Sequence, residues 1–133
     1  MIKATDLKIE YLTGNPTIDI VSPKLLWKVQ EAKTQTAYQV KASVDGQEIY
    51  DTGKVRSSVM DHKYQGKLKS RSQVTWKVRL WDEKDICGEW SEKSSFEIGL
   101  LDEKDWVAEW IDPELFHEPE ERQPASYLKK EFL

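Results

Sequence analysis

Carboxylates are the most abundant side chains in this sequence that could do chemistry, and the chemistry they would suit is acid–base hydrolysis. The 133 residues include 24 Asp and Glu, and one acidic run extends from Glu118 to Glu121. Glycoside hydrolysis needs two carboxyl groups held about 5–9.5 Å apart. Glu120 and Glu121 belong to a proline-containing stretch that is typical of a linker. We therefore interpret them as solvated surface and predict no catalytic residue in this chain.

Metal and nucleophile chemistry are not indicated either. His62 and His117 stand apart from each other, and no cysteine lies at metal-ligand spacing from them, so we expect no metal site. We interpret His62 and the preceding Asp61 as a surface pair. The single cysteine, Cys87, has acidic neighbours that oppose a thiolate, and we interpret it as inert. No phosphate-binding loop, nucleotide fingerprint or Ser-His-Asp arrangement is recognisable, so we predict no cofactor.

Three of the six tryptophans fall within one predicted hairpin, VTWKVRLWDEKDICGEWSE, at residues 74–92. Trp76 alternates in step with the Val and Leu residues of this run, so we expect it in the core. There it would face Trp27 across the two sheets, and each ring would bury about 150–250 Å².

The other two tryptophans have a different setting. Trp81 has the same parity as Lys77 and Arg79, and Trp90 comes from the far side of the hairpin. A cation over an indole face contributes roughly 0.5–1 kcal/mol at an exposed site. We therefore predict an outward-facing ladder of Lys77, Arg79, Trp81 and Trp90, which resembles the Trp-Ser arrangement of cytokine-receptor fibronectin domains.

Two alternatives stay open for these four residues. One is a contact with another domain of the same chain. The other is a platform for a sugar ring, which the surroundings disfavour because a saccharide site needs convergent polar groups, whereas the neighbours here are long and charged.

The elements that must position these side chains are β-strands. Apolar and polar residues alternate over residues 7–11, 25–30, 38–44 and 74–80, and a last strand is expected from about Trp90 to Ile98. Asp45-Gly46 predicts a two-residue hairpin whose central positions have positive φ. About seven short strands within residues 1–101 predict an all-β fold, an immunoglobulin-like (fibronectin type III-like) antiparallel β-sandwich.

Composition limits the class of protein. Hydrophobic residues make up 38% of the chain and aromatic residues 11%, which is too aromatic for a disordered chain. The formal charge is −4 and no basic stripe is present, so we expect neither nucleic-acid nor membrane binding. A single cysteine excludes an intrachain disulfide. With no apolar leader segment at the N-terminus, we expect a cytoplasmic protein.

The sequence changes character after Leu101. Residues 102–133 hold three of the five prolines and two short apolar pieces. We predict that they are a linker and the first strands of a following β-sandwich domain, so that the chain is a truncated fragment of a longer protein. Trp106 and Trp110 would make the inter-domain contact. Without that domain they would fold back, or form a homodimer through residues 106–133.

Seven pieces of the sequence, taken in order, resemble one family. They are NPTIDIVSPKLLWKV, QTAYQVKAS, YDTGKV, LKSRSQVTWKVRLWDE, WSEKSSFEIGLLDEKDW, AEWI and LKKEF. Together they are similar to the N-terminal region of bacterial α-L-rhamnosidases. The resemblance implies a fibronectin type III-like first domain and a second β-sandwich beginning near Trp106–Ile111. It also implies that the inverting catalytic carboxylates belong to a later helical barrel, outside these 133 residues.

We therefore predict a non-catalytic accessory and structural domain of a glycoside hydrolase that resembles α-L-rhamnosidase. The parent enzyme would hydrolyse terminal α-L-rhamnosides, and the partners of this domain would be other domains of the same chain. A carbohydrate-binding module that uses exposed Trp81 and Trp90 is the first alternative, although we do not expect direct sugar binding. A fibronectin-type protein-interaction module is the second.

Overall fold

The structure, a computed structural model, describes residues 1–107 as an eight-stranded β-sandwich with one 3₁₀ turn. The prediction of an all-β, immunoglobulin-like fold is confirmed, with eight strands where about seven were expected. The elements are β1 (Lys3–Ile9), β2 (Thr17–Ile18), β3 (Lys24–Gln30), β4 (Ala37–Val44), β5 (Gln47–Asp51), β6 (Asp61–Lys63), β7 (Gln73–Trp81), β8 (Ser94–Ile98) and η1 (Glu103–Asp105). None of the helical structure in this part of the chain is long and apolar enough to cross a membrane.

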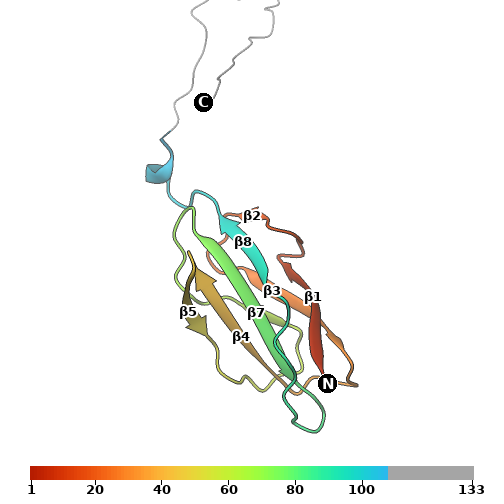
Figure 1. Ribbon diagram of the computed structural model, residues 1–133. Coiled ribbons are helices and arrows are strands. Elements are labelled where there is room, and N and C mark those ends of the chain that lie inside the picture. The colour runs from red at the N-terminus through yellow and green to blue at the C-terminus, as the bar shows by residue number, and fades with distance from the viewer. Residues whose placement is uncertain (108–133) are drawn as a thin grey trace, which may run out of the picture.

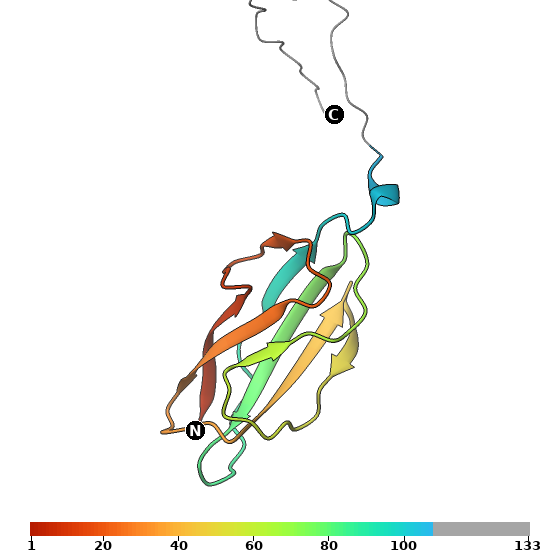
Figure 2. The same cartoon turned by 180° about the vertical axis from the view of Figure 1, so that it is seen from behind.

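The strands form two sheets that pack face to face (Figures 1 and 2). One sheet has the order β1-β3-β6 and the other has the order β2-β8-β7-β4-β5. The pairs are antiparallel except for β2 and β8, which run parallel over two residues. The chain leaves the sandwich beyond β8, at the end where β2 lies (Figure 1).

The pair β4–β7 forms the centre of the larger sheet and separates core from surface by residue parity. Tyr38 pairs with Leu80, and the pairs Val40–Val78 and Ala42–Trp76 are likewise buried. The alternate pairs point outward, and one of them joins Gln39 to Arg79. Side chains on a strand alternate between faces, so this register fixes which residues can meet on the outer surface.

Aliphatic and aromatic side chains from both sheets fill the core. Its largest fully buried members are Trp76, Tyr64, Phe96, Ile2, Ile9, Leu25 and Leu80. The expected pairing of Trp27 with Trp76 is wrong. The ring that lies beside Trp27 is Tyr38, with 5.1 Å between the ring centroids.

A buried glutamine explains how Trp27 is held. The Trp27 Nε1–H donates to Oε1 of Gln35 at 2.9 Å, and Gln35 is 2% exposed. The amide nitrogen of Gln35 in turn donates to the carbonyl oxygens of Ser57 and Val59, each at 2.9 Å. The glutamine therefore pairs a buried indole N–H and two backbone carbonyl oxygens at once.

Local expectations were partly confirmed. Asp45 and Gly46 have φ values of 49° and 84° at the β4–β5 turn, as a two-residue hairpin requires. The first strand is shorter than expected: β1 ends at Ile9, and Tyr11 is 69% exposed with a φ of 66°. The last strand begins at Ser94 and not near Trp90.

The surface pairing of His62 with Asp61 is also wrong. The ring of His62 is half-buried and points to the other sheet, where its Nδ1 lies 2.9 Å from the hydroxyl of Tyr38 and its Nε2 lies 2.7 Å from the hydroxyl of Tyr50. These aromatic partners come from distant strands, which parity within one strand cannot reveal.

Candidate functional site

The outer face of the five-stranded sheet carries a row of alternating cations and indoles. The guanidinium carbon of Arg79 lies 5.3 Å from the ring centroid of Trp81 and 4.7 Å from that of Trp90. The ammonium of Lys77 lies 4.8 Å from the Trp90 centroid. These separations fall within the range of cation–π attraction. We call these four residues, Lys77, Arg79, Trp81 and Trp90, the ladder.

Two further lysines extend the ladder, and the sequence did not single them out. Lys54, which follows β5, lies 4.9 Å from the Trp81 centroid, and Lys41 on β4 lies 5.7 Å from the Trp90 centroid. Lys41 pairs with Lys77 in the β4–β7 register, so the alternation of residues along β4 could have predicted its position on this face. Lys54 is outside the strands, and no strand pattern indicates its position.

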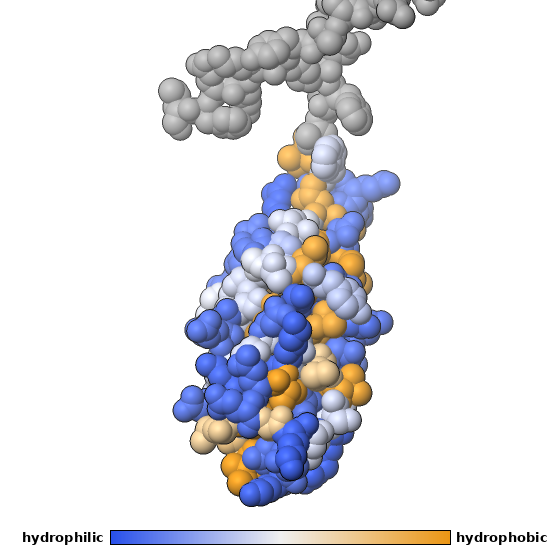
Figure 3. Space-filling view, turned by 90° about the vertical axis from the view of Figure 1, so that its right-hand side faces the viewer, coloured by the Kyte–Doolittle hydropathy of each residue, from blue (hydrophilic) through white to orange (hydrophobic). Residues whose placement is uncertain are grey.

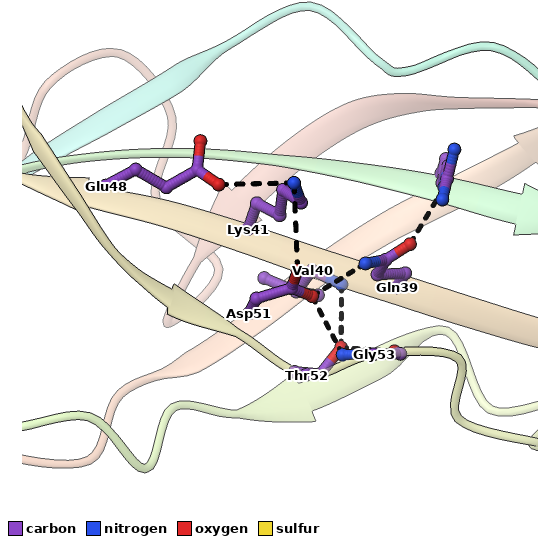
Figure 4. Close-up of polar contacts among 8 residues, drawn as sticks. Gln39, Val40, Lys41, Glu48, Asp51, Thr52 and Gly53 are labelled. Atoms are coloured by element: carbon purple, nitrogen blue, oxygen red, sulfur yellow. Dashed lines mark hydrogen bonds and ion pairs between the residues drawn. The ribbon is translucent and has the colours of Figure 1, made fainter.

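Gln39 orients the central cation. Its Oε1 accepts from Nε of Arg79 at 2.9 Å, and its Nε2 donates to Oδ1 of Asp51 at 2.6 Å. Figure 4 shows Gln39 and Lys41 both reaching Asp51 on the edge strand. The hydrogen bonds from Gln39 and from the Gly53 backbone N–H lower the pKa of Asp51, with a smaller contribution from Lys41. The carboxylate, the amide and the guanidinium thus form one connected chain across β5, β4 and β7.

Ser91 positions the second indole. Its backbone N–H donates to the carbonyl oxygen of Val78 at 2.8 Å, and its hydroxyl accepts from the Val78 N–H at 3.0 Å. The segment before β8 is therefore tied to β7 one residue after Trp90. This holds the Trp90 ring over the cations of the outer face.

The ladder rings are not openly displayed. Trp81 is 9% exposed and Trp90 is half-buried. A sugar platform offers an indole face to solvent together with convergent polar groups, whereas here cations lie over both rings. The geometry suits a clamp on the sheet surface.

A second feature is an open groove of about 320 Å³ between β1 and the start of β8. Asp6 and Glu92 are the carboxylates in its lining. Asp6 bonds to Lys28 at 2.8 Å and lies 3.6 Å from Lys8, and the hydrogen bond from Lys28 is the main cause of its lowered pKa. Asp6 is therefore held as a carboxylate, and a general acid in glycoside hydrolysis must be protonated.

The connector that follows β8 is the third feature. The Ser70 hydroxyl accepts from the Leu101 N–H at 2.7 Å and donates to the carboxylate of Asp105. Asp102 caps η1 by accepting from the Lys104 N–H at 3.1 Å. Beyond η1, Trp106 is 63% exposed.

The apolar surface extends to this end of the molecule. Figure 3 looks onto the side of the sandwich that carries β1, where apolar side chains form a broken line that reaches the connector. Trp110, the second residue expected in an inter-domain contact, lies outside the described residues. Within residues 1–107 no group of three His, Cys, Asp or Glu side chains gathers to hold a metal ion.

The two packed sheets, the ladder and the serine-tied segment before β8 define an immunoglobulin-like sandwich domain. The chain belongs to the family of Rha78A-like N-terminal immunoglobulin domains, which matches residues 4–102. The predicted resemblance is thereby confirmed.

Relatives and solved structures agree with the family. An α-L-rhamnosidase of Alteromonas sp. (strain LOR) is 35% identical over 110 residues, which is 73% of this chain and 12% of that enzyme. The structure of α-L-rhamnosidase from Dictyoglumus thermophilum aligns with a TM-score of 0.76 at 38% identity, over 83% of this chain and 14% of that one. The crystal structure of Streptomyces avermitilis α-L-rhamnosidase complexed with L-rhamnose aligns with a TM-score of 0.77 at 33% identity, over 84% of this chain and 12% of that one.

The chain thus spans about an eighth of the length of the enzymes it matches. An N-terminal immunoglobulin domain in enzymes of this name fits an accessory role.

Proposed function

We propose that this chain is the non-catalytic N-terminal accessory domain of an α-L-rhamnosidase, and that it holds the next domain of that enzyme in a fixed orientation. The observation that carries the proposal is the family match over residues 4–102, together with relatives named α-L-rhamnosidase of which the chain covers only about 12%. The parent enzyme would hydrolyse terminal α-L-rhamnosides with carboxylates from another domain.

The connector supports the orienting role. Ser70 ties both Leu101 and Asp105 to the turn before β7, so the chain leaves the sandwich along a restrained path. A short, anchored connector limits how far two domains can rotate relative to each other. Trp106, exposed at its end, would then enter the contact with the next domain, whose first strands would begin within residues 102–133.

The ladder takes a structural part in this proposal. Five cation–indole contacts join β4, β7, the residues after β5 and the segment before β8, and Gln39 fixes the guanidinium at their centre. We propose that they hold the segment before β8 against the sheet. A homodimer through residues 106–133 and a cytoplasmic location stay predictions from the sequence.

Two assays test the proposal. The 133-residue chain should release no 4-nitrophenol from 4-nitrophenyl α-L-rhamnoside, whereas the longer protein encoded in the same reading frame should. Tryptophan fluorescence of the chain should not change on titration with L-rhamnose or a rhamnosylated flavonoid.

Three results would overturn it. Turnover by the 133-residue chain would make this region catalytic, and a reading frame without a longer, active product would remove the parent enzyme. A saturable fluorescence change, lost in both Trp81→Ala and Trp90→Ala, would make the domain a carbohydrate-binding module.

A further inference from the structure

One imidazole joins the two sheets at the side of the sandwich where β5 and β6 are the edge strands. His62 lies on β6 of the three-stranded sheet, which Figure 2 shows in front of the larger sheet and next to β3. Its Nδ1 lies 2.9 Å from the hydroxyl of Tyr38 on β4, and its Nε2 lies 2.7 Å from the hydroxyl of Tyr50 on β5. Both ring nitrogens are thus used by tyrosines of the opposite sheet.

The surroundings of this imidazole are aromatic and apolar. Leu25, fully buried on β3, lies opposite His62 in the strand pairing. The Tyr38 ring packs edge-on to the imidazole at 5.6 Å, and the Tyr50 ring lies 6.0 Å from the imidazole and 4.4 Å from the buried Tyr64 ring.

Burial and a neighbouring charge have opposite effects on the pKa of the imidazole. Burial lowers the pKa of His62, while the negative charge of its chain neighbour Asp61 acts in the other direction. Burial raises the pKa of both Tyr38 and Tyr50, so they stay as hydroxyls at neutral pH. The imidazole is thus the group of this cluster that gains a proton when the pH falls below neutrality.

Counting protons shows what acid would do here. A neutral imidazole has one N–H donor and one bare nitrogen that accepts, so one tyrosine donates to it and the other accepts from it. An imidazolium has two donors and no acceptor. Protonation therefore leaves one tyrosine O–H without its acceptor and places a charge among aromatic rings, and both changes cost free energy.

The two tyrosines are not equally free to respond. Tyr38 is 6% exposed and packed against Trp27. Tyr50 is on the edge strand, is half-buried, and its hydroxyl already lies 3.4 Å from the backbone N–H of Gln65. The Tyr50 hydroxyl is the one that can turn to solvent.

We propose that His62 is a proton-sensitive latch between the two sheets: when neutral it joins β6 to β4 and β5, and when protonated it releases β5 at Tyr50. The latch would loosen one side of the sandwich in acid without unfolding the β4–β7 centre. It depends on neither the ladder nor the connector.

The test compares the 133-residue chain with two glutamine variants. Urea unfolding is followed by tryptophan fluorescence from about pH 7.5 down to about pH 5.5, above the range in which carboxylates titrate. Below the unfolded-state pKa of about 6.5, the unfolding constant of the unmutated 133-residue chain should rise by up to tenfold per pH unit until the folded-state pKa of His62 is reached. His62→Gln should remove this dependence, because its amide does not titrate. His117→Gln, at the other histidine, should keep it.

A second readout works even if His62→Gln fails to fold. In NMR spectra of the unmutated chain, the ring protons of His62 should titrate below about 6.5, the pKa of a free histidine side chain. Protection of the β5 amides, taken as the exchange rate relative to the intrinsic rate at each pH, should fall at least tenfold as His62 protonates, while protection in β7 stays unchanged. Tyr50→Phe should show the fast β5 exchange already at neutral pH, and Tyr11→Phe, at an exposed tyrosine, should not.

Either of two outcomes overturns the latch. One is a His62 ring that titrates at or above about 6.5, the pKa of a free histidine side chain. The other is a pH dependence of unfolding that is the same in the unmutated chain and in His62→Gln.

Discussion

Gln39 accepts a 2.9 Å hydrogen bond from Nε of Arg79 across the β4–β7 pair, and this contact turns the guanidinium toward two indoles. The two residues are 40 positions apart in sequence and directly opposite in the sheet register. Nε is the guanidinium nitrogen nearest the stem, so a bond there leaves the planar end over the rings of Trp81 and Trp90. A lysine could not do this, because it has no planar fork and no second donor along its stem.

The first prediction concerns this guanidinium. Arg79→Ala should lower the free energy of unfolding by about 1–2 kcal/mol, because two cation–π contacts of roughly 0.5–1 kcal/mol each are lost. Arg79→Lys should recover only part of that loss. Urea unfolding followed by tryptophan fluorescence measures both. Arg56→Ala is the matched control: its side chain is 72% exposed, and we expect a change within about 0.5 kcal/mol. Equal stability of Arg79→Ala and Arg56→Ala would show that the ladder does not stabilise the sandwich.

The second prediction concerns the buried glutamine. Gln35→Leu should destabilise the protein by at least about 2 kcal/mol, because the Trp27 indole N–H and the carbonyl oxygens of Ser57 and Val59 lose their partner. The native-state fluorescence spectrum should also shift as the Trp27 environment changes. Gln65→Leu, at an exposed glutamine, serves as the control. A Gln35→Leu protein as stable as this control would mean that the three groups find other partners.

Period-two alternation could predict the sandwich but not the polar contacts that tie it together. It placed β3, β4 and β7, because each has one buried face. It missed β6, since three residues are too few to show a period. The same rule put Arg79 and Trp81 on one face but could not reveal Gln39, whose partner is 40 residues away.

The contacts of His62 also could not be predicted from the alternation of residues along a strand. In the sequence His62 stands beside Asp61 and resembles a surface pair. Its true partners are 24 and 12 residues distant and come from the other sheet. Contacts between sheets depend on how the two layers are stacked, and a strand pattern carries no information on stacking.

The third prediction concerns a close approach within the β7–β8 connection. A Cβ at Gly88 would lie 1.8 Å from the carbonyl oxygen of Ile2, so the N-terminal segment would have to move. Gly88→Ala should therefore cost about 1–3 kcal/mol, as overpacking does elsewhere. At Gly99 the nearest atom to an added Cβ is 3.6 Å away, so Gly99→Ala should be close to neutral. Thermal unfolding of the two variants decides: similar melting temperatures would contradict the tight contact with Ile2.

The last prediction tests whether the connector is fixed by the sandwich. Ser70→Ala removes the acceptor of the Leu101 N–H and the donor to Asp105. The amide of Leu101 should then exchange at least tenfold faster by NMR, because local opening of the connector no longer breaks those two bonds. Global stability should fall by no more than about 1 kcal/mol, since neither bond lies within a sheet. Ser58→Ala, at an exposed serine, controls for the loss of a hydroxyl. In a longer enzyme that carries this domain, the proposed orienting role predicts that Ser70→Ala leaves catalytic turnover almost unchanged and speeds proteolysis after residue 101. Unchanged exchange at Leu101 would show that the connector keeps its path without Ser70, and the orienting role would then have to come from the contact made by Trp106.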